Sequence, residues 1–252
     1  MANSRLSSSL RSTLDVSAAI VMIVAGVAIV WMIATSKPSS PPSASDTKAG
    51  QRRSSSLSVP EEPVSVRGAA RLGDASAPVV VIEYSDFRCP YCAKFAQIVL
   101  PELRRKSIQS GNLQLIFKHL PLEELHPEAP AAAQVAECAR RQDRFWPVHD
   151  ALFAAPRGDG RAEFIQISRR FDLDRVKLDT CMVGDSGAQV QADAGEARGL
   201  GIRGTPAFLF GRLQPDGRVM GFRWETGLIP VELFERIVHQ TLKAGPDQLV
   251  GR

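Results

Sequence analysis

The chain has 252 residues with a formal net charge of +4, and 44% of its residues are apolar, which allows one large or two small folded domains. The basic excess is small, and no basic stripe with interleaved aromatic residues occurs in the sequence, which argues against a nucleic-acid-binding protein. The four cysteines are an even number, as is typical of proteins from an oxidising compartment.

An apolar segment without charged residues occupies residues 16–36, after an N-terminal tail of residues 1–15. At about 20 residues it is long enough to cross a bilayer as a helix. It is longer than the apolar region of a typical signal peptide, and no clear small-x-small cleavage site follows it, so we expect an uncleaved signal anchor. A cleaved signal peptide is the alternative. Basic residues flank both ends, so the positive-inside rule does not fix the orientation.

Residues 37–66 are dominated by serine and proline. Such a composition cannot bury enough apolar surface to fold, so we expect a flexible linker here. A linker of this length would let the following domain reach partners near the membrane. The remaining segment, residues 67–245, is expected to be the folded domain.

A cysteine motif follows a buried strand in this domain. The uninterrupted apolar run Val79–Ile82 predicts a strand buried on both faces. A polar turn then leads to Cys89-Pro90-Tyr91-Cys92, in which Pro90 suits the first position of a helix. Cys89 is therefore expected at a helix N-terminus, where unpaired N–H groups favour the thiolate. Cys92 lies one turn later and can close a disulfide with Cys89, so the motif predicts a redox dithiol.

The periodicity of the rest of the domain predicts a mixed α/β fold. The helix after Cys89 should run to about Lys106 with a kink at Pro101, and Leu113–Phe117 should be a strand parallel to the first one. The later segments are predicted as a helical block at residues 122–199, a hairpin of Ala207–Phe210 and Arg218–Phe222, and an amphipathic helix at Pro230–Ala244.

Three motifs connect the chain with a known family: Asp86-Phe-Arg-Cys-Pro-Tyr-Cys92, Phe145-Trp146 with His149-Asp150 and Phe153, and Gly201-Ile-Arg-Gly-Thr-Pro-Ala-Phe208. With them, the chain resembles the DsbA-like thiol–disulfide oxidoreductases of the thioredoxin superfamily. The resemblance covers about residues 67–244 and implies a thioredoxin fold (βαβ…ββα) with a helical insertion. It also implies a redox-active disulfide, Cys89–Cys92, with no further cofactor and no metal.

The resemblance assigns roles to the residues of the dithiol loop. Cys89 would be the nucleophile and Cys92 its resolving partner, while Pro90 and Tyr91 would tune the redox potential. An inert disulfide or half of a zinc site are the alternatives, although zinc would require a second closely spaced pair. A Cys-Pro-Tyr-Cys loop also occurs in glutaredoxins, so it leaves the direction of electron flow open.

Three residues outside the loop also receive roles from the resemblance. Pro206 would be the cis-proline opposite the dithiol, with the backbone of Thr205 ready to pair with an extended substrate. Glu83 lies six residues before Cys89, where the superfamily often carries a buried carboxylate, and would exchange a proton with Cys92. An ordinary trans proline and a solvated glutamate are the respective alternatives.

Cys138 and Cys181 both fall on predicted helices of the insertion. Each could be a small buried apolar residue, but in an oxidising compartment a structural disulfide between them is expected.

Together these features predict a membrane-tethered enzyme whose catalytic domain lies on the extracytoplasmic side, periplasmic or facing the cell wall. It would be a thiol–disulfide oxidase that donates the Cys89–Cys92 disulfide to reduced secreted or membrane proteins. A membrane-embedded partner would reoxidise it. The alternatives are a reductase or isomerase, for example in cytochrome maturation, and a non-catalytic peptide-binding or chaperone module.

Overall fold

The computed structural model describes residues 57–155, 166–167 and 169–243. The predicted tail (1–15), membrane segment (16–36) and most of the linker (37–66) lie outside these residues, as do the last two residues of the predicted domain. Within the described part of the chain, no helix is long and apolar enough to cross a membrane.

The centre of the domain is a six-stranded sheet in the order β1-β6-β5-β3-β4-β2. The middle strand, β3 (Val79–Ser85), is buried at every position, pairs in parallel with β4 (Leu113–His119) and pairs antiparallel with β5 (Ala207–Leu213). The other strands are β1 (Val64–Ser65), β2 (Ala70–Leu72) and β6 (Arg218–Thr226). The predicted parallel unit and hairpin are therefore both present, and the thioredoxin-like α/β fold is confirmed.

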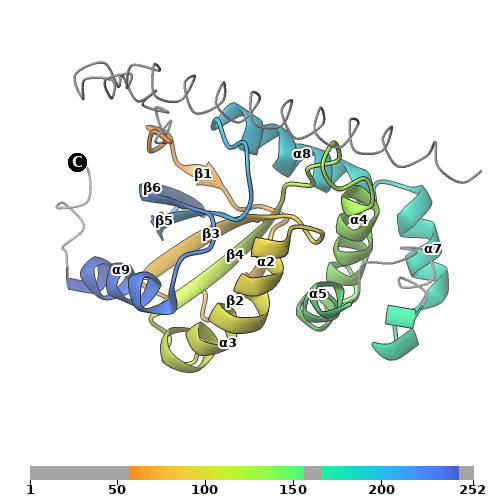
Figure 1. The fold of residues 1–252 in the computed structure, drawn as a ribbon, viewed down its shortest axis with the longest axis horizontal. Coiled ribbons are helices and arrows are strands. Elements are labelled where there is room, and N and C mark those ends of the chain that lie inside the picture. The colour runs from red at the N-terminus through yellow and green to blue at the C-terminus, as the bar shows by residue number, and fades with distance from the viewer. Residues whose placement is uncertain (1–56, 156–165, 168, 244–252) are drawn as a thin grey trace, which may run out of the picture. The chain divides into compact units, whose positions relative to one another are not determined.

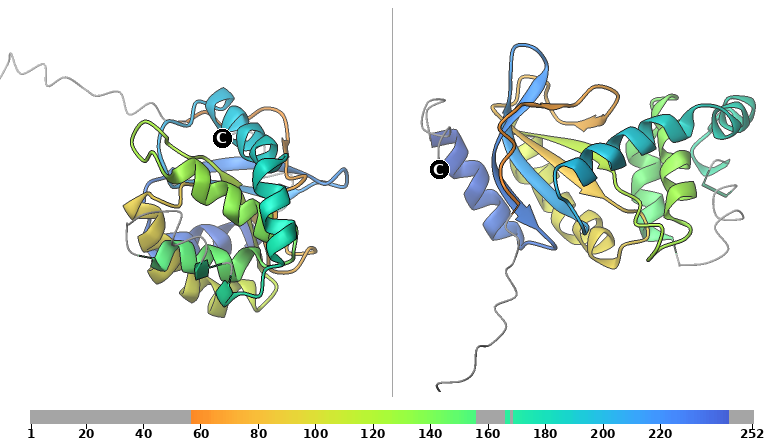
Figure 2. Two further views of the ribbon diagram at one scale, coloured as in Figure 1. Left: turned by 90° about the vertical axis from the view of Figure 1, so that its right-hand side faces the viewer. Right: turned by 90° about the horizontal axis from the view of Figure 1, so that it is seen from above.

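Alternate residues of β3 point into two different hydrophobic cores. Val79 and Val81 pack with residues of the helices that follow Cys89 and of the closing helix α9 (Val231–Lys243). Val80 and Ile82 pack on the opposite face, against helix α8 (Ser186–Gly199). Because successive side chains of a strand point to opposite faces, a strand covered on both sides must be apolar throughout. Figures 1 and 2 show helices on both faces of the sheet.

The helical segment after Cys89 combines α-helical and π-helical turns. It consists of α2 (Pro90–Lys94), η1 (Phe95–Val99), α3 (Leu100–Leu103) and η2 (Arg104–Ile108). The prediction placed a kink at Pro101. The structure has a π turn directly before it, in which the Leu100 N–H bonds to the carbonyl of Phe95. Proline has no N–H to donate and its ring crowds the preceding turn, which a wider π turn accommodates.

The helical insertion contains α4 (Ala129–Arg140), α5 (Phe145–Ala154), α7 (Arg175–Val183) and α8. Of these helices, α4, α5 and α7 lie beside one end of the sheet, and α8 runs from them over one of its faces (Figure 1). Small residues of α4 pack against aromatic residues of α5 and against Phe87, just before the dithiol. The insertion therefore shares a core with the active-site loop.

The start of the folded domain was predicted wrongly. Residues 57–66 were assigned to the linker, but β1 pairs with β6, and Val64 and Val66 are buried. The indole N–H of Trp224 also donates a 3.0 Å hydrogen bond to the carbonyl of Ser58. A two-residue strand inside a serine- and proline-rich composition has no periodicity that the sequence could reveal.

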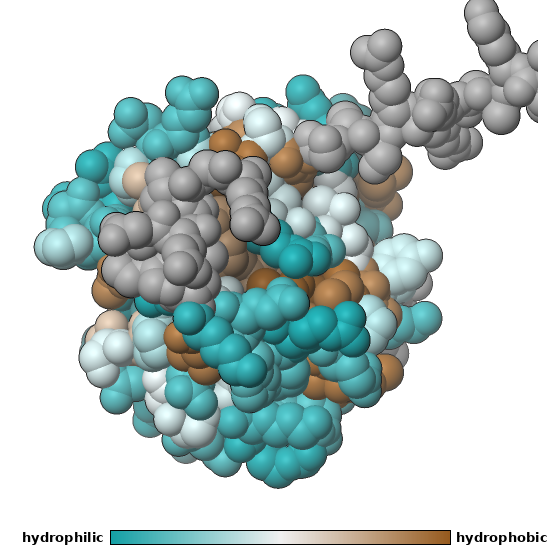
Figure 3. Space-filling model, turned by 90° about the vertical axis from the view of Figure 1, so that its left-hand side faces the viewer, coloured by the Kyte–Doolittle hydropathy of each residue, from teal (hydrophilic) through white to brown (hydrophobic). Residues whose placement is uncertain are grey.

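Helix α9 packs against one face of the sheet, where it shares a hydrophobic core with Val79, Val81 and Phe210. The side chains of Phe234, Ile237 and Val238 on this helix are buried, whereas those of Glu232 and Arg236 are exposed. The predicted amphipathic closing helix is thus present. Figure 3 shows a largely hydrophilic surface with limited hydrophobic areas.

Candidate active site

The dithiol sits where β3 ends and α2 begins. Cys89 is the N-cap residue of α2, and Pro90 occupies the first turn, as predicted. The Cys89 N–H donates a 3.0 Å hydrogen bond to the Asp86 carbonyl, and the Cys89 carbonyl accepts from the Ala93 N–H at 3.0 Å. Cys89 therefore faces the unpaired N–H groups at the start of the helix. Tyr91, in the first turn of α2 between the two cysteines, is 55% exposed.

Cys89 is set up to be a thiolate. Its pKa is lowered to about 5, chiefly because the Cys92 thiol donates a hydrogen bond to its sulfur. The Thr205 side chain and the backbone N–H groups of Cys92 and Tyr91 act in the same direction, against the opposing effect of burial. Cys89 is only 5% exposed, so these few donors replace water around the sulfur.

Cys92 has the opposite properties. It is completely buried, and burial raises its pKa well above the usual value, with further contributions from Cys89 and from the charge of Glu83. Both cysteines are unpaired in the structure. Reduced, the pair therefore consists of a thiolate nucleophile, Cys89, and a buried thiol, Cys92.

Glu83 is fully buried on β3, as the resemblance implies. Burial raises its pKa to about 8, against a smaller opposite effect of the nearby Ser85 hydroxyl. Neither carboxylate oxygen has a hydrogen-bond partner within the described part of the chain. The charge of the ionised Glu83 raises the pKa of Cys92, so this carboxyl lies close enough to the buried sulfur to act on it electrostatically. The proton relay itself stays a prediction.

The loop before β5 lies opposite the dithiol. Its Thr205–Pro206 peptide bond is cis, as expected from the sequence, and Thr205 is largely buried. The Cys89 sulfur lies 3.3 Å from the carbonyl oxygen of Thr205 and donates to it only when it is protonated. The structure thus brings the two predicted parts of the site together, while their role in binding a substrate stays a prediction.

Two buried histidines near this site had no predicted catalytic role. His119 is the partner of Ser85 in the β3–β4 register, and His149 on α5 lies in contact with Phe87 and Phe117. Burial lowers the pKa of His119 to about 3 and also lowers that of His149, so both imidazoles are neutral at physiological pH. His149 is thus a packing residue of the aromatic cluster around Phe87 and Phe117.

Asp86 and His126 were also given no role by the sequence. The structure makes them a pair, with His126 Nδ1 2.8 Å from the buried Asp86 carboxylate. Asp86 lies inside the cysteine motif, but His126 is 40 positions away, and the sequence offered no signal that connects the two.

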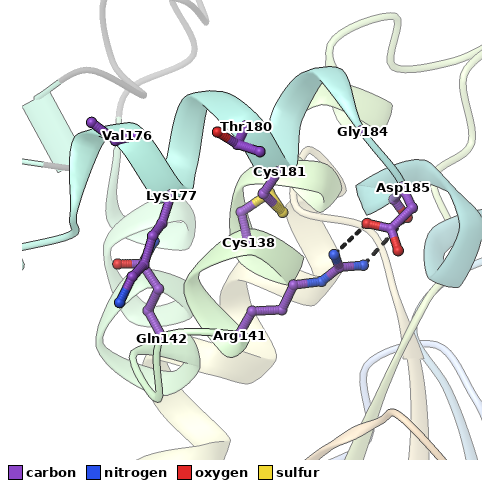
Figure 4. Close-up of a pocket in the computed structure, with 9 residues that line it drawn as sticks. All are labelled: Cys138, Arg141, Gln142, Val176, Lys177, Thr180, Cys181, Gly184 and Asp185. Atoms are coloured by element: carbon purple, nitrogen blue, oxygen red, sulfur yellow. Dashed lines mark hydrogen bonds and ion pairs between the residues drawn. A yellow bond between two sulfur atoms is a disulfide. The ribbon is translucent and has the colours of Figure 1, made fainter.

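Cys138 and Cys181 form a disulfide with a Cα–Cα distance of 5.8 Å. It joins α4 to α7 and borders a surface pocket of about 540 Å³ (Figure 4). Arg141 bridges to Asp185 at one side of this pocket, and Lys177 and Gln142 lie at the other. Among the described residues, no group of three or more His, Cys, Asp or Glu side chains is arranged to hold a metal ion.

Comparison with known proteins supports the assignment of this chain to the thioredoxin-like proteins. The thioredoxin family model matches residues 65–218, more than half of the chain. Among solved structures, the fold is similar to α-DsbA1 from Wolbachia pipientis, with a TM-score of 0.62 and 22% identity over 71% of this chain and 92% of that one. It is also similar to BdbD from Bacillus subtilis, with a TM-score of 0.61 and 19% identity over 74% of this chain and 99% of that one.

Two curated relatives extend the comparison. Probable disulfide bond formation protein D from Bacillus cereus is 30% identical over 145 residues, which cover 54% of this chain and 67% of that protein. Na(+)/H(+) antiporter NhaA 3 from Salinispora tropica is 34% identical over 137 residues, which cover 54% of this chain but only 20% of the antiporter. The chain belongs to the thioredoxin family, and its fold and dithiol are those of the DsbA-like thiol–disulfide oxidoreductases.

Proposed function

We propose that this protein is a thiol–disulfide oxidase that donates the Cys89–Cys92 disulfide to reduced proteins outside the cytoplasm. The observation that supports this direction is the lowered pKa of Cys89, about 5, next to a Cys92 that stays a thiol. Stabilising the Cys89 thiolate stabilises the reduced form of the protein. A dithiol that is stable when reduced makes a strong oxidant when it is a disulfide.

The reaction proceeds by two exchanges. A substrate thiolate attacks the Cys89 sulfur of the disulfide, and Cys92 leaves and takes up a proton, for which Glu83 is the nearest proposed donor. A second substrate thiolate then attacks the substrate sulfur of the mixed disulfide and releases Cys89 as a thiolate. Two electrons pass to the protein, and the substrate gains one disulfide. A membrane-embedded oxidant is the proposed partner that restores the Cys89–Cys92 disulfide.

The substrate would pair with the backbone of Thr205, which lies directly opposite Cys89. Reduced, unfolded segments of secreted or membrane proteins are the proposed clients, because an extended chain can add its backbone hydrogen bonds at such a site. Pro90 and Tyr91 would tune the potential, since they set the start of α2 and carry one of the N–H groups that face Cys89.

The location is part of the same proposal. A helix at residues 16–36 would anchor the chain in the membrane, with residues 37–56 as the tether. The related disulfide bond formation protein of Bacillus cereus and the related segment in an ion antiporter support a membrane-side, extracytoplasmic setting. Fusion of the C-terminus to a reporter that is active only outside the cytoplasm tests this orientation, and an inactive reporter contradicts it.

The direction of electron flow is tested by equilibrating the full-length protein with glutathione buffers. An oxidase is expected to have a potential of about −120 mV, whereas a value of about −270 mV would indicate a reductase. Cys92→Ser should trap mixed disulfides with secreted proteins, and a failure to trap any would contradict the oxidase. Full function of Cys89→Ser in the cell would instead support a non-catalytic binding module.

A further inference from the structure

The carboxylate of Asp86 connects the dithiol loop to a second loop. Its side chain is completely buried. Oδ1 accepts a 2.7 Å hydrogen bond from the Arg88 N–H, within the dithiol loop. Oδ2 accepts a 2.8 Å hydrogen bond from the Leu122 N–H and lies 2.8 Å from Nδ1 of His126. One buried carboxylate therefore holds two segments that are far apart in sequence.

The main chain of Asp86 contacts both cysteines. Its carbonyl accepts the N–H of Cys89 at 3.0 Å, which fixes the residue that caps α2. Its backbone N–H acts on the sulfur of Cys92 and lowers the pKa of that thiol against the larger effect of burial. A shift of Asp86 would therefore displace the surroundings of both sulfurs together.

His126 lies in the turn that leads into α4. Its N–H donates to the Leu122 carbonyl at 2.8 Å, and its carbonyl accepts from the Ala129 N–H at 2.9 Å. A second link between the same two loops is the Arg88–Glu128 ion pair, at 3.4 Å. The backbone of His126 is thus held at the start of the helical insertion.

We propose that His126 is a positioning residue for the dithiol, because its Nδ1–H holds the buried carboxylate of Asp86 whose main chain contacts both cysteines. This inference rests on the proposed redox function. A carboxylate only accepts hydrogen bonds, so Nδ1 carries the proton. Without His126, Oδ2 keeps only one of its two described donors, the Leu122 N–H, so the buried carboxylate is held less firmly and can shift toward water. The His126 side chain is 21% exposed, so Nε2 does not need a protein partner.

The reduced form depends on this anchor more than the oxidised form does. The Cys89 thiolate is stabilised by N–H groups of Tyr91 and Cys92, which are aligned only while Cys89 caps α2. In the disulfide form there is no thiolate for these groups to stabilise. Loosening Asp86 should therefore raise the pKa of Cys89 and shift the equilibrium toward the disulfide.

The test compares three variants of the full-length chain. His126→Leu removes the donor, and His126→Asn restores an N–H close to the position of Nδ1. His239→Leu is the matched control, because this histidine is 67% exposed on α9. The measurements are the equilibrium with glutathione and the thiolate absorbance of Cys89 as a function of pH. His126→Leu should shift the equilibrium constant with glutathione toward the disulfide, and lower the acid dissociation constant of Cys89, each by about threefold or more. His126→Asn should recover most of both shifts, and the control should match the wild type.

A purely structural role of His126 would overturn the proposal. In that case His126→Leu would lower the unfolding free energy of the reduced and oxidised forms equally and leave the glutathione equilibrium and the Cys89 titration unchanged. Equal shifts in His126→Asn and His126→Leu would also contradict it. A wild-type protein that does not exchange with glutathione would refute the oxidase, and the Cys89 titration would still decide whether His126 positions the dithiol.

Discussion

The Cys89 sulfur and the carbonyl oxygen of Thr205 are 3.3 Å apart although 116 positions separate the two residues. Their proximity follows from the pairing of β3 with β5, in which Tyr84 is opposite Ala207. One strand ends just before the dithiol and the other begins just after Pro206, so both loops emerge at the same end of the sheet. The nucleophile and the backbone proposed to bind substrate are therefore held by the two most central strands.

The first prediction concerns the linkage between Cys89 and stability. In the reduced protein Cys89 should titrate with a pKa of about 5, measured from thiolate absorbance. Since an unfolded cysteine has a pKa of about 8.5, the unfolded state binds more protons between these two values. The reduced form should therefore gain stability relative to the oxidised form as pH rises from about 5 to about 8.5. Denaturant unfolding of both forms measures this, and parallel pH curves would contradict it.

The second prediction concerns Glu83 as the proton donor to Cys92. Its pKa of about 8 keeps the carboxyl protonated at neutral pH. Glu83→Gln should slow reduction of the Cys89–Cys92 disulfide by about 10- to 100-fold at pH 7, because the leaving Cys92 then lacks its donor. The wild-type rate should fall as pH rises above about 8, and the variant should lack this decline. Stopped-flow kinetics with a dithiol peptide measures both, and an unchanged pH profile would exclude the role.

The third prediction concerns the disulfide between α4 and α7. Cys138 and Cys181 are 43 positions apart, and on the chain-entropy model a loop of that length contributes about 4 kcal/mol to the free energy of unfolding. The double variant Cys138→Ala/Cys181→Ala should be destabilised by about this amount in urea. The dithiol should still exchange with glutathione where the variant is folded. A loss below about 1 kcal/mol would show that the unfolded chain is constrained by other contacts.

The fourth prediction concerns acid stability and His119. Its pKa of about 3 lies below that of an unfolded histidine, about 6.5, so below that pH the unfolded state binds the extra proton. This residue should therefore destabilise the fold progressively as pH falls from about 6.5 to about 3. Glu83 and Asp193, whose pKa values are raised, act with the opposite sign. His119→Asn should reduce the slope of stability against pH in this window by about 1.4 kcal/mol per unit. An identical slope in the variant would contradict the buried, neutral imidazole.

The alternation of secondary structure was predictable because it depends on local patterns. The buried strand Val79–Ser85 is a continuous apolar run, and the closing helix has a clear apolar stripe. The short strands β1 and β2 were not predictable, since two or three residues carry no period and their stability comes from neighbours in the sheet. For the same reason the start of the domain was placed too late.

The sequence by itself determined the chemistry of the dithiol, because a buried strand, a proline at the first helical turn and a cysteine before it set the environment of Cys89 within a few residues. Only the tertiary structure decided how that chemistry is supported. The contacts of Asp86 with His126 and of Cys89 with Thr205 join residues far apart in the chain. The complete burial of the Glu83 side chain likewise depends on helices that cover the sheet from both sides. Such contacts depend on how distant segments pack, which no local pattern encodes.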